Sequence, residues 1–484
     1  MPEKNAYAMP SAREIAALTV PQLGMMLCHL SISMTDLWVA GRLGADVQAS
    51  IGIVSQVFTL LMLIASLAGS GCLAAISQSL GAGLGRRARR YAALIAGMAG
   101  MTGLAAAALG LLSLPLTLRF MHVPPPLEPV VRTFIITYSC QLPFYYTLIM
   151  LNSVFRAYKL VRLPLIAVAA VAVGNLVGSA GFGLGLWGLP DFGYAGVAWS
   201  TFGSALLGLA CNLCAVVRKG ILNRAALAPW RWVRRALPAL WRIGGPAALG
   251  QMAGHMGSLV LLSLLAGLPG DMVPVLAGMT LGARVETFLT FPVAALGMSV
   301  AILSGHLLGA NRLEALRRFV RRTSLAAALA LGGGAGLLFL FRESVAGLFS
   351  TDPEAVRQGA RFLAFACAAV PFKTYSILIN GAFSGAGATG LACKVNCLVM
   401  WAFQVPLAWA LGHACGASGV YAAMLCANVA TALWLGRLHA GKNGLNVGCE
   451  NARMPHPDEP KPEKRHVQRA QRNKAALARP RELP

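Results

Sequence analysis

Long apolar runs recur along the whole chain and restrict what it can fold into. Only 12% of the 484 residues are charged, whereas a soluble domain carries about 25%. Runs of roughly 20 apolar residues can cross the ~30 Å hydrocarbon core of a bilayer, where only helices and closed barrels satisfy the backbone. Because alternating strand segments of about ten residues are absent, the sequence predicts an all-α integral membrane protein with twelve transmembrane helices. We expect these spans at residues 15–39, 48–78, 91–118, 130–154, 163–187, 194–217, 243–268, 275–303, 323–348, 359–383, 395–413 and 418–438.

Positive charges gather in alternate connectors between these spans. The net charge is +24, and its densest groups include Arg86 to Arg90, Arg312 to Arg322 and the stretch 218–242. Cytoplasmic loops of membrane proteins carry an excess of Lys and Arg. The pattern therefore predicts a protein of the plasma membrane, the inner membrane in bacteria, with both termini in the cytoplasm. It also argues against nucleic acid as a partner and leaves membrane lipids as the expected neighbours.

The chain repeats itself at an offset of 228 residues (371 − 143). Pro143-Phe144 and Pro371-Phe372 open similar stretches, and SQSLGAG at 77–83 corresponds to GHLLGAN at 305–311. Six spans in each half would make the two repeats parallel, with a cleft between them. We therefore expect a cytoplasmic N-terminus (1–14), a first lobe (15–217), a basic cytoplasmic linker (218–242), a second lobe (243–440) and a disordered basic cytoplasmic tail (441–484). The linker stretch PWRWVRRALPALWR is amphipathic and predicts a helix lying at the cytoplasmic interface.

Asp36 is the strongest candidate for a functional group inside the membrane. An ionisable side chain at bilayer depth costs about 2.5–3.5 kcal/mol on insertion scales, so its presence favours a role in ion or substrate movement. Asn175 and Thr201 could reach the same place if the first, fifth and sixth spans pack together. The alternatives are a solvated Asp36 at the interface and polar residues that merely join helices.

A second set of polar and aromatic residues could line a substrate cleft. Arg284 and Glu286 are two residues apart and so do not share a helix face. Lys373 could instead extend its amine to the membrane surface, and Gln251 and His255 could serve helix packing. The candidate cleft residues are Glu286, Arg284, Gln251, His255, Lys373, Gln56 and Tyr145.

Other kinds of function leave no mark in the sequence. No GxxxxGK[ST] nucleotide loop is present, and Cys211-x-x-Cys214 lacks a second ligand pair. No cluster of His, Asp, Glu or a nucleophile suggests an enzyme. We therefore expect no cofactor and no catalysis, with energy drawn from an ion gradient and with Na⁺ at Asp36 as the one candidate metal.

Several motifs in order resemble the multidrug and toxic compound extrusion (MATE) family over about residues 10–440. They are TDLWVAGRLG at the end of the first span, SQSLGAG at the close of the second, NLVGSAGFGLG and FGYAGVAWST across the fifth and sixth, and FPVAALGMSVAILSGHLLGAN in the second half. The resemblance implies a V-shaped, two-lobed exporter that alternates between outward-facing and inward-facing states. It implies export of organic, often cationic, compounds in exchange for H⁺ or Na⁺.

The resemblance also implies roles for individual residues. Asp36 matches the family's amino-lobe acid, Asn175 its partner and Thr201 its hydroxyl, while Ser179 stands where several members carry Asp. Lys373 stands where some members carry a carboxylate. With two carboxylates missing, proton coupling becomes the favoured prediction over Na⁺ coupling. A flippase for a lipid-linked sugar or a related lipid precursor is the alternative function, and a monomer is the expected state.

Overall fold

The computed structural model describes residues 9–120, 123–223, 226, 228–269, 272–350 and 352–441. In these residues it contains helices and no strand. A short 3-10 turn lies at Leu186–Gly188 and a π-helical segment at Val399–Gln404. The α-helices are α1 Ala12–Leu43, α2 Ala45–Gly81, α3 Gly85–Phe120, α4 Glu128–Ala157, α5 Arg162–Leu184, α6 Gly193–Arg218, α7 Trp230–Ala266, α8 Val273–Gly309, α9 Leu313–Leu340, α10 Arg342–Gly347, α11 Pro353–Ala386, α12 Thr389–Leu398, α13 Val405–Cys415 and α14 Ala417–Ala440. The tail predicted to be disordered lies outside the described residues, except for Gly441.

The predicted membrane class is confirmed. Within the described residues, twelve helices are long and apolar enough to cross a bilayer, when Thr389–Cys415 counts as one helix interrupted by its π-helical segment. Large apolar side chains such as Leu112 and Leu329 lie on the outer surface with more than three quarters of their area exposed. Hydrocarbon is the solvent that such a surface suits. The chain is an integral membrane protein.

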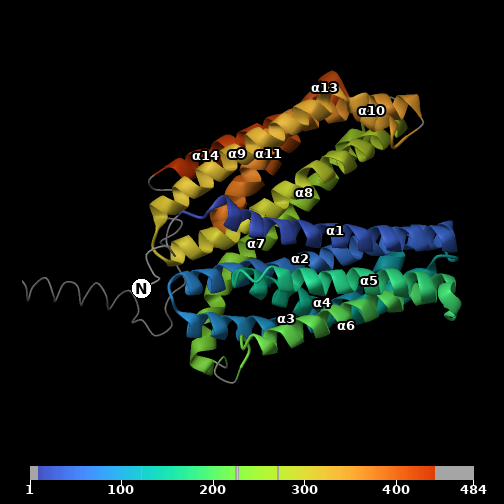
Figure 1. Cartoon of the computed structure of the whole chain (residues 1–484). Coiled ribbons are helices and arrows are strands. Elements are labelled where there is room, and N and C mark those ends of the chain that lie inside the picture. The colour runs from blue at the N-terminus through green and yellow to red at the C-terminus, as the bar shows by residue number, and fades with distance from the viewer. Residues whose placement is uncertain are drawn as a thin grey trace, which may run out of the picture.

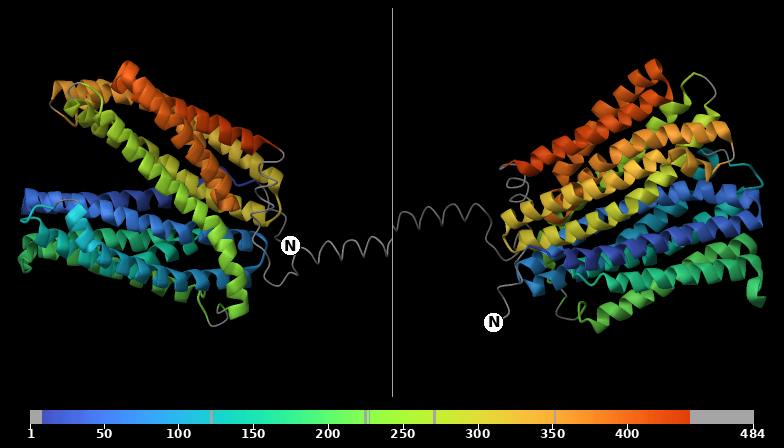
Figure 2. Two further views of the ribbon diagram at one scale, coloured as in Figure 1. Left: turned by 180° about the vertical axis from the view of Figure 1, so that it is seen from behind. Right: turned by 45° about the horizontal axis from the view of Figure 1, so that its top comes forward.

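The helices form two lobes that diverge like the arms of a V (Figure 1). Helices α1 to α6 make one arm, and α8 to α14 make most of the other (Figure 2). The first described residues and the end of α14 lie at the closed end of the V, as do the starts of α3 and α9 with their arginine clusters. The V therefore opens at the end opposite the basic residues.

Two glycines at repeat-related positions bring the arms together. A Cβ added at Gly81 of α2 would collide with the backbone of His306, and one at Gly309 of α8 would collide with the backbone of Gln78. These glycines are 228 residues apart (309 − 81), as are Gln78 and His306 (306 − 78). The shared Leu-Gly-Ala motif thus marks the point where α2 and α8 cross, and the repeat is the reason that the contact is reciprocal.

Polar contacts hold the closed end of the V together. Gln78 donates from Nε2 to the carbonyl oxygen of Ala386 at 2.9 Å, and His306 Nε2 lies 2.9 Å from the carbonyl oxygen of Ala157. Gln22 of α1 donates to Ser299 of α8 at 2.8 Å. Each contact joins one arm to the other, so the structure is closed at the end that carries the basic residues.

The predicted interfacial helix is not a separate element. Helix α7 starts at Trp230 and runs without a break to Ala266, so only residues 219–229 lie between α6 and α7. Trp232 is buried in the core of the first arm, where its ring meets Tyr91 edge-on at 4.8 Å between centroids. Trp241 is 53% exposed. The start of α7 is therefore packed onto the first arm and ties the two arms together.

Helix α11 is also longer than its predicted span. Asp352 accepts hydrogen bonds from the backbone N–H groups of Glu354 and Ala355 at 3.1 and 3.3 Å, which caps the helix start. Gly387, at φ 77°, ends it in the left-handed conformation that glycine adopts without strain. The helix thus begins six residues before the predicted boundary, which places Lys373 about 30 Å along its axis and not near its end.

Candidate functional site

A cavity of about 710 Å³ lies between the two arms. Helices α1, α2 and α4 line it from the first arm, with Asp36, Gln48 and Tyr145 among their side chains. Helix α8 lines it from the second arm with Arg284 and Phe288. Both lobes thus contribute to one chamber, in the region where the predicted cleft was expected.

Asp36 lines this cavity and is hydrogen-bonded to the helices behind it. Asn175 Nδ2 donates to Asp36 Oδ1 at 3.1 Å and to Thr201 Oγ1 at 3.1 Å. The same Nδ2 lies 3.4 Å from Ser179 Oγ, which is the weakest of the three contacts. Asn175 and Ser179 are fully buried. The structure therefore brings all four residues of the predicted coupling site into one cluster.

Glycines allow α5 and α6 to approach closely enough to build this cluster. A Cβ added at Gly178 would lie 2.8 Å from the Cβ of Ser200, and one at Gly196 would collide with the backbone of Phe182. Small residues at membrane helix interfaces permit such close packing. Asn175 and Ser179 are one turn apart on α5, so both face the same strip of α6. The motif NLVGSAGFG therefore supplies the polar groups together with the space that they need.

One acceptor in the cluster lacks a donor. Asn175 Oδ1 is buried and has no hydrogen-bond partner among the described residues. Leaving such a group unsatisfied costs about 1–3 kcal/mol. A protonated carboxyl beside a carboxamide can accept from its N–H and donate to its oxygen. Asp36 already accepts from the N–H of Asn175, so a proton on Asp36 is the donor that would complete the pair.

The cluster contains a single charged side chain. No group of three or more His, Cys, Asp or Glu residues gathers anywhere in the part of the chain that the structure describes. Asp36 is the one carboxylate among the described residues that line the cavity, and its neighbours Asn175, Ser179 and Thr201 are neutral. Of these four side chains, only Asp36 can change its charge by taking up or releasing a proton.

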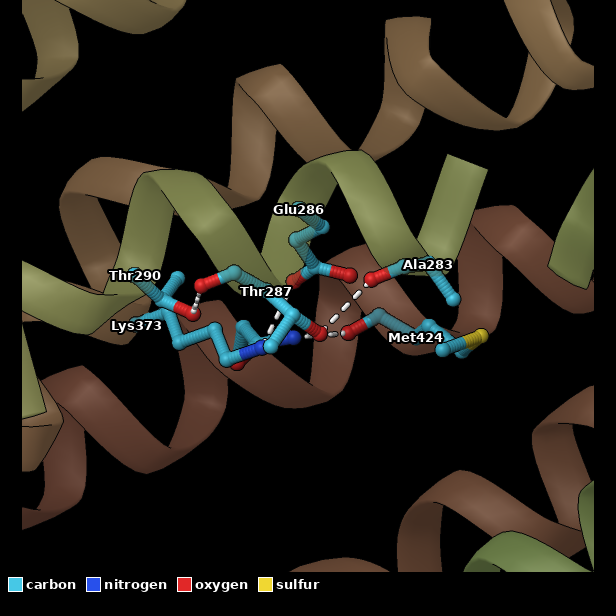
Figure 3. Close-up of polar contacts among 7 residues, drawn as sticks. Ala283, Glu286, Thr287, Thr290, Lys373 and Met424 are labelled. Carbon is cyan, nitrogen blue, oxygen red and sulfur yellow. Dashed lines mark hydrogen bonds and ion pairs between the residues drawn. The ribbon is translucent and has the colours of Figure 1, made fainter. Parts of the chain in front are cut away.

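Glu286 and Lys373 form an ion pair within the second arm. Lys373 Nζ of α11 lies 2.6 Å from Glu286 Oε1 of α8, and the two side chains are 35% and 15% exposed (Figure 3). Neither residue lines the cavity between the arms. The structure therefore differs from the prediction that Glu286 and Lys373 line the cleft between the lobes, since each charge instead neutralises the other within the second arm.

A smaller polar cavity of about 230 Å³ adjoins this pair inside the second arm. Lys373 lines it together with Asn380, Asn396, Gln404 and Asn428. Asn396 Nδ2 donates to Asn380 Oδ1 at 3.2 Å. In the first arm, the repeat-related Asn152 instead accepts from Asn212 of α6 at 2.7 Å. The two repeat-related asparagines thus belong to different hydrogen-bond networks in the two arms.

The other predicted cleft residues divide into two groups. Arg284 and Tyr145 line the cavity between the arms. Gln56 and Gln251 are exposed and His255 is partly exposed, and none of the three lines the two cavities described above. The structure does not bring these three to the Asp36 cluster.

Sequence reasoning missed several cavity residues that a helical spacing would have revealed. His29, Ser33 and Asp36 follow one another on α1 at spacings of four and three, and all line the cavity. Tyr138 and Tyr145 are seven apart on α4 and line it as well. Residues at such spacings share a helix face. A search for polar residues on the face that carries Asp36 would have found the first group.

Comparisons with known proteins agree with this architecture. The chain is 26% identical over 432 residues to a probable multidrug resistance protein NorM of Chromobacterium violaceum, covering 84% of this chain and 88% of that protein. It is 22% identical over 403 residues to the uncharacterized transporter YisQ of Bacillus subtilis, covering 82% and 86%. The Vibrio cholerae MATE transporter VcmN in the bent form has the same fold, with a TM-score of 0.81 at 22% identity over 91% of this chain and 97% of that chain.

The family is shown by a sequence model as well as by the shared fold. The family model described as MatE matches residues 21–180 and 246–410, which is most of the chain. The two matched blocks fall on the two arms of the V, one on each side of the start of α7. The predicted resemblance is thereby confirmed, and the chain belongs to the MatE family, the multidrug and toxic compound extrusion transporters.

Proposed function

We propose that this protein is a secondary active exporter that moves organic amphipathic compounds out of the cell in exchange for protons. The observation that carries the proposal is the position of Asp36. Its carboxylate lines the cavity between the arms and is hydrogen-bonded to the fully buried Asn175. A carboxylate that borders both a substrate cavity and a buried polar cluster is placed to couple binding of a proton to release of a substrate.

In this mechanism Asp36 takes up a proton from the open side and gives it up on the other side. Protonation removes the negative charge and provides a donor for the unsatisfied Asn175 Oδ1. The protonated cluster is then neutral and internally hydrogen-bonded, so it can be buried at low cost. Thr201 and Ser179 hold the carboxamide in place. Proton uptake thus stabilises a first arm in which the helices around Asp36 pack more closely. This packing reduces the space for the substrate and favours its release.

The state described here is the outward-facing one in our proposal. Arginine-rich helix starts lie at the closed end of the V, and the positive-inside rule assigns that end to the cytoplasm. The cavity would then open to the outside. The reciprocal crossing of α2 and α8 is the natural pivot for rocking one repeat against the other.

Reconstituted protein tests the proposal directly. We expect wild-type proteoliposomes to move a fluorescent amphipathic dye when a ΔpH is imposed and not when a Na⁺ gradient is imposed. Asp36→Asn should abolish ΔpH-driven transport while the protein still inserts and elutes as a single species. Asp46→Asn is the matched control, because Asp46 is an exposed carboxylate at the start of α2. Undiminished transport by Asp36→Asn, or transport that follows Na⁺ alone, would refute proton coupling through this residue.

A further inference from the structure

Arg284 is a cation without a partner in the cavity between the arms. It lines the chamber from α8, and it makes no ion pair or hydrogen bond with any of the described residues. Guanidinium stays charged at all physiological pH values and presents a fork of N–H donors that fits a carboxylate in two parallel hydrogen bonds. The cavity thus contains a permanent positive charge that is ready to bind an anion.

The nearby carboxylates are already engaged. Glu286, two residues from Arg284, lies on another face of α8 and is neutralised by Lys373 at 2.6 Å. Asp36, on the opposite arm, accepts from Asn175 and forms no ion pair with Arg284. In the proposed cycle Asp36 also becomes neutral when it binds a proton. Among the residues that the structure describes, no acid therefore pairs with Arg284.

Aromatic rings line the same chamber from both arms. Phe288 and Phe291 follow Arg284 on the same face of α8, with their ring centroids 5.9 Å apart. Phe58 faces them from the first arm's side of the chamber and packs against Tyr138 at 5.3 Å between centroids. Apolar walls with one fixed charge bind a flat apolar body and orient one ionic group.

We propose that Arg284 binds an anionic group of the transported compound and so selects aromatic carboxylates, zwitterions included, over simple organic cations. The inference rests on the proposed export function and narrows its substrate class. Charge-assisted hydrogen bonds to Arg are stronger than neutral ones. Arg284 is thus a specificity-determining residue, whereas Asp36 couples transport to protons.

The test compares two dyes that differ only in the group that Arg284 would bind. Tetramethylrhodamine carries a carboxylate, and its methyl ester carries only the positive charge. Fluorescence polarisation with the full-length protein in nanodiscs, without any gradient, measures binding of each. We expect the wild-type protein to bind the carboxylate dye at least tenfold more tightly than the ester. Arg284→Gln should remove that difference by weakening binding of the carboxylate dye, and it should not weaken binding of the cationic ester.

Two further variants complete the experiment. Arg284→Lys keeps the charge but loses the fork, so it should retain only part of the preference. Arg132→Gln is the matched control, because Arg132 is an exposed arginine of α4 whose partner is Glu128 on the surface. It should bind both dyes as the wild-type protein does.

The outcomes distinguish this inference from the proposed function. A wild-type protein that binds the ester as tightly as the carboxylate overturns the inference, and so does an Arg284→Gln variant that weakens both dyes equally. Stronger competition by a polyprenyl phosphate than by either dye would overturn the aromatic carboxylate class. Selective, Arg284-dependent binding without any gradient-driven transport would instead support the inference and count against the export function.

Discussion

The ion pair between Glu286 and Lys373 makes a quantitative prediction about stability. The charged atoms are 2.6 Å apart, which corresponds to an attraction of about 6 kcal/mol at an effective dielectric constant of about 20. Desolvation of both groups offsets much of that attraction, so the net value of the pair is small. Removing one partner should destabilise the protein more, because the remaining charge keeps its desolvation cost and loses the attraction of the opposite charge.

The two single variants should therefore differ. Glu286 is only 15% exposed, so Lys373→Met strands a carboxylate with little access to water and should destabilise the protein by about 3 kcal/mol. Lys373 is 35% exposed, and Glu286→Gln leaves an acceptor for its amine. That variant should cost about 1 kcal/mol. The double variant removes both charges and should lie within about 1 kcal/mol of the wild-type protein.

Thermal unfolding of the purified protein in one detergent, followed by tryptophan fluorescence, provides the measurement. We expect the apparent Tm to fall most in Lys373→Met and to recover in the double variant. This recovery is the coupling that a double-mutant cycle detects. If the effects of the two substitutions simply add, the charges do not compensate each other in the folded protein and the reasoning is refuted. A Glu286→Gln variant less stable than Lys373→Met would refute the argument from exposure.

Two further predictions concern the packing that shapes the V. Gly309→Ala should prevent the close crossing of α2 and α8 and reduce both the yield of folded protein and its apparent Tm, because the added methyl meets a backbone carbonyl that cannot move aside. Gly333→Ala, where the added methyl meets open space, should leave both unchanged, and equal loss in the two variants would count against the crossing. Trp232→Ala should destabilise the protein by about 3–5 kcal/mol in chemical unfolding, since the ring is buried at the start of α7. Trp230→Ala, at an exposed position of the same helix turn, should lower the free energy of unfolding by less than about 0.5 kcal/mol. Equal losses in the two variants would contradict the burial of Trp232.

The sequence predicted the membrane helices, but it predicted only some of the side-chain contacts between them. Twelve spans and two lobes followed from apolar length and from the repeat, because both can be read directly from the order of the residues. The resemblance also grouped Asp36 with Asn175 and Thr201, and the structure brings them together. The pairing of Glu286 with Lys373 was not foreseen, since it depends on how α8 is rotated relative to α11.

Span boundaries were least predictable where a helix continues into polar sequence. Helix α7 begins in an arginine-rich stretch that composition assigned to a linker, yet Trp232 within it is buried. Helix α11 begins at Pro353, ahead of the apolar run that was used to place its span. Packing of Trp232 accompanies the early start of α7, and the Asp352 cap accompanies that of α11. Hydropathy reports on neither packing nor capping.

The sequence by itself determined that this chain is a helical membrane protein built from two related halves. It also determined which end is basic and which small residues are available for close packing, because these properties belong to the residues in order. Only the tertiary structure decided that Arg284 meets the cavity while Glu286 is paired away from it. The physical reason is that both the interior and the lipid-facing surface of such a protein are apolar. The pattern along a helix therefore says little about which face is inside, and that choice comes from how the helices pack.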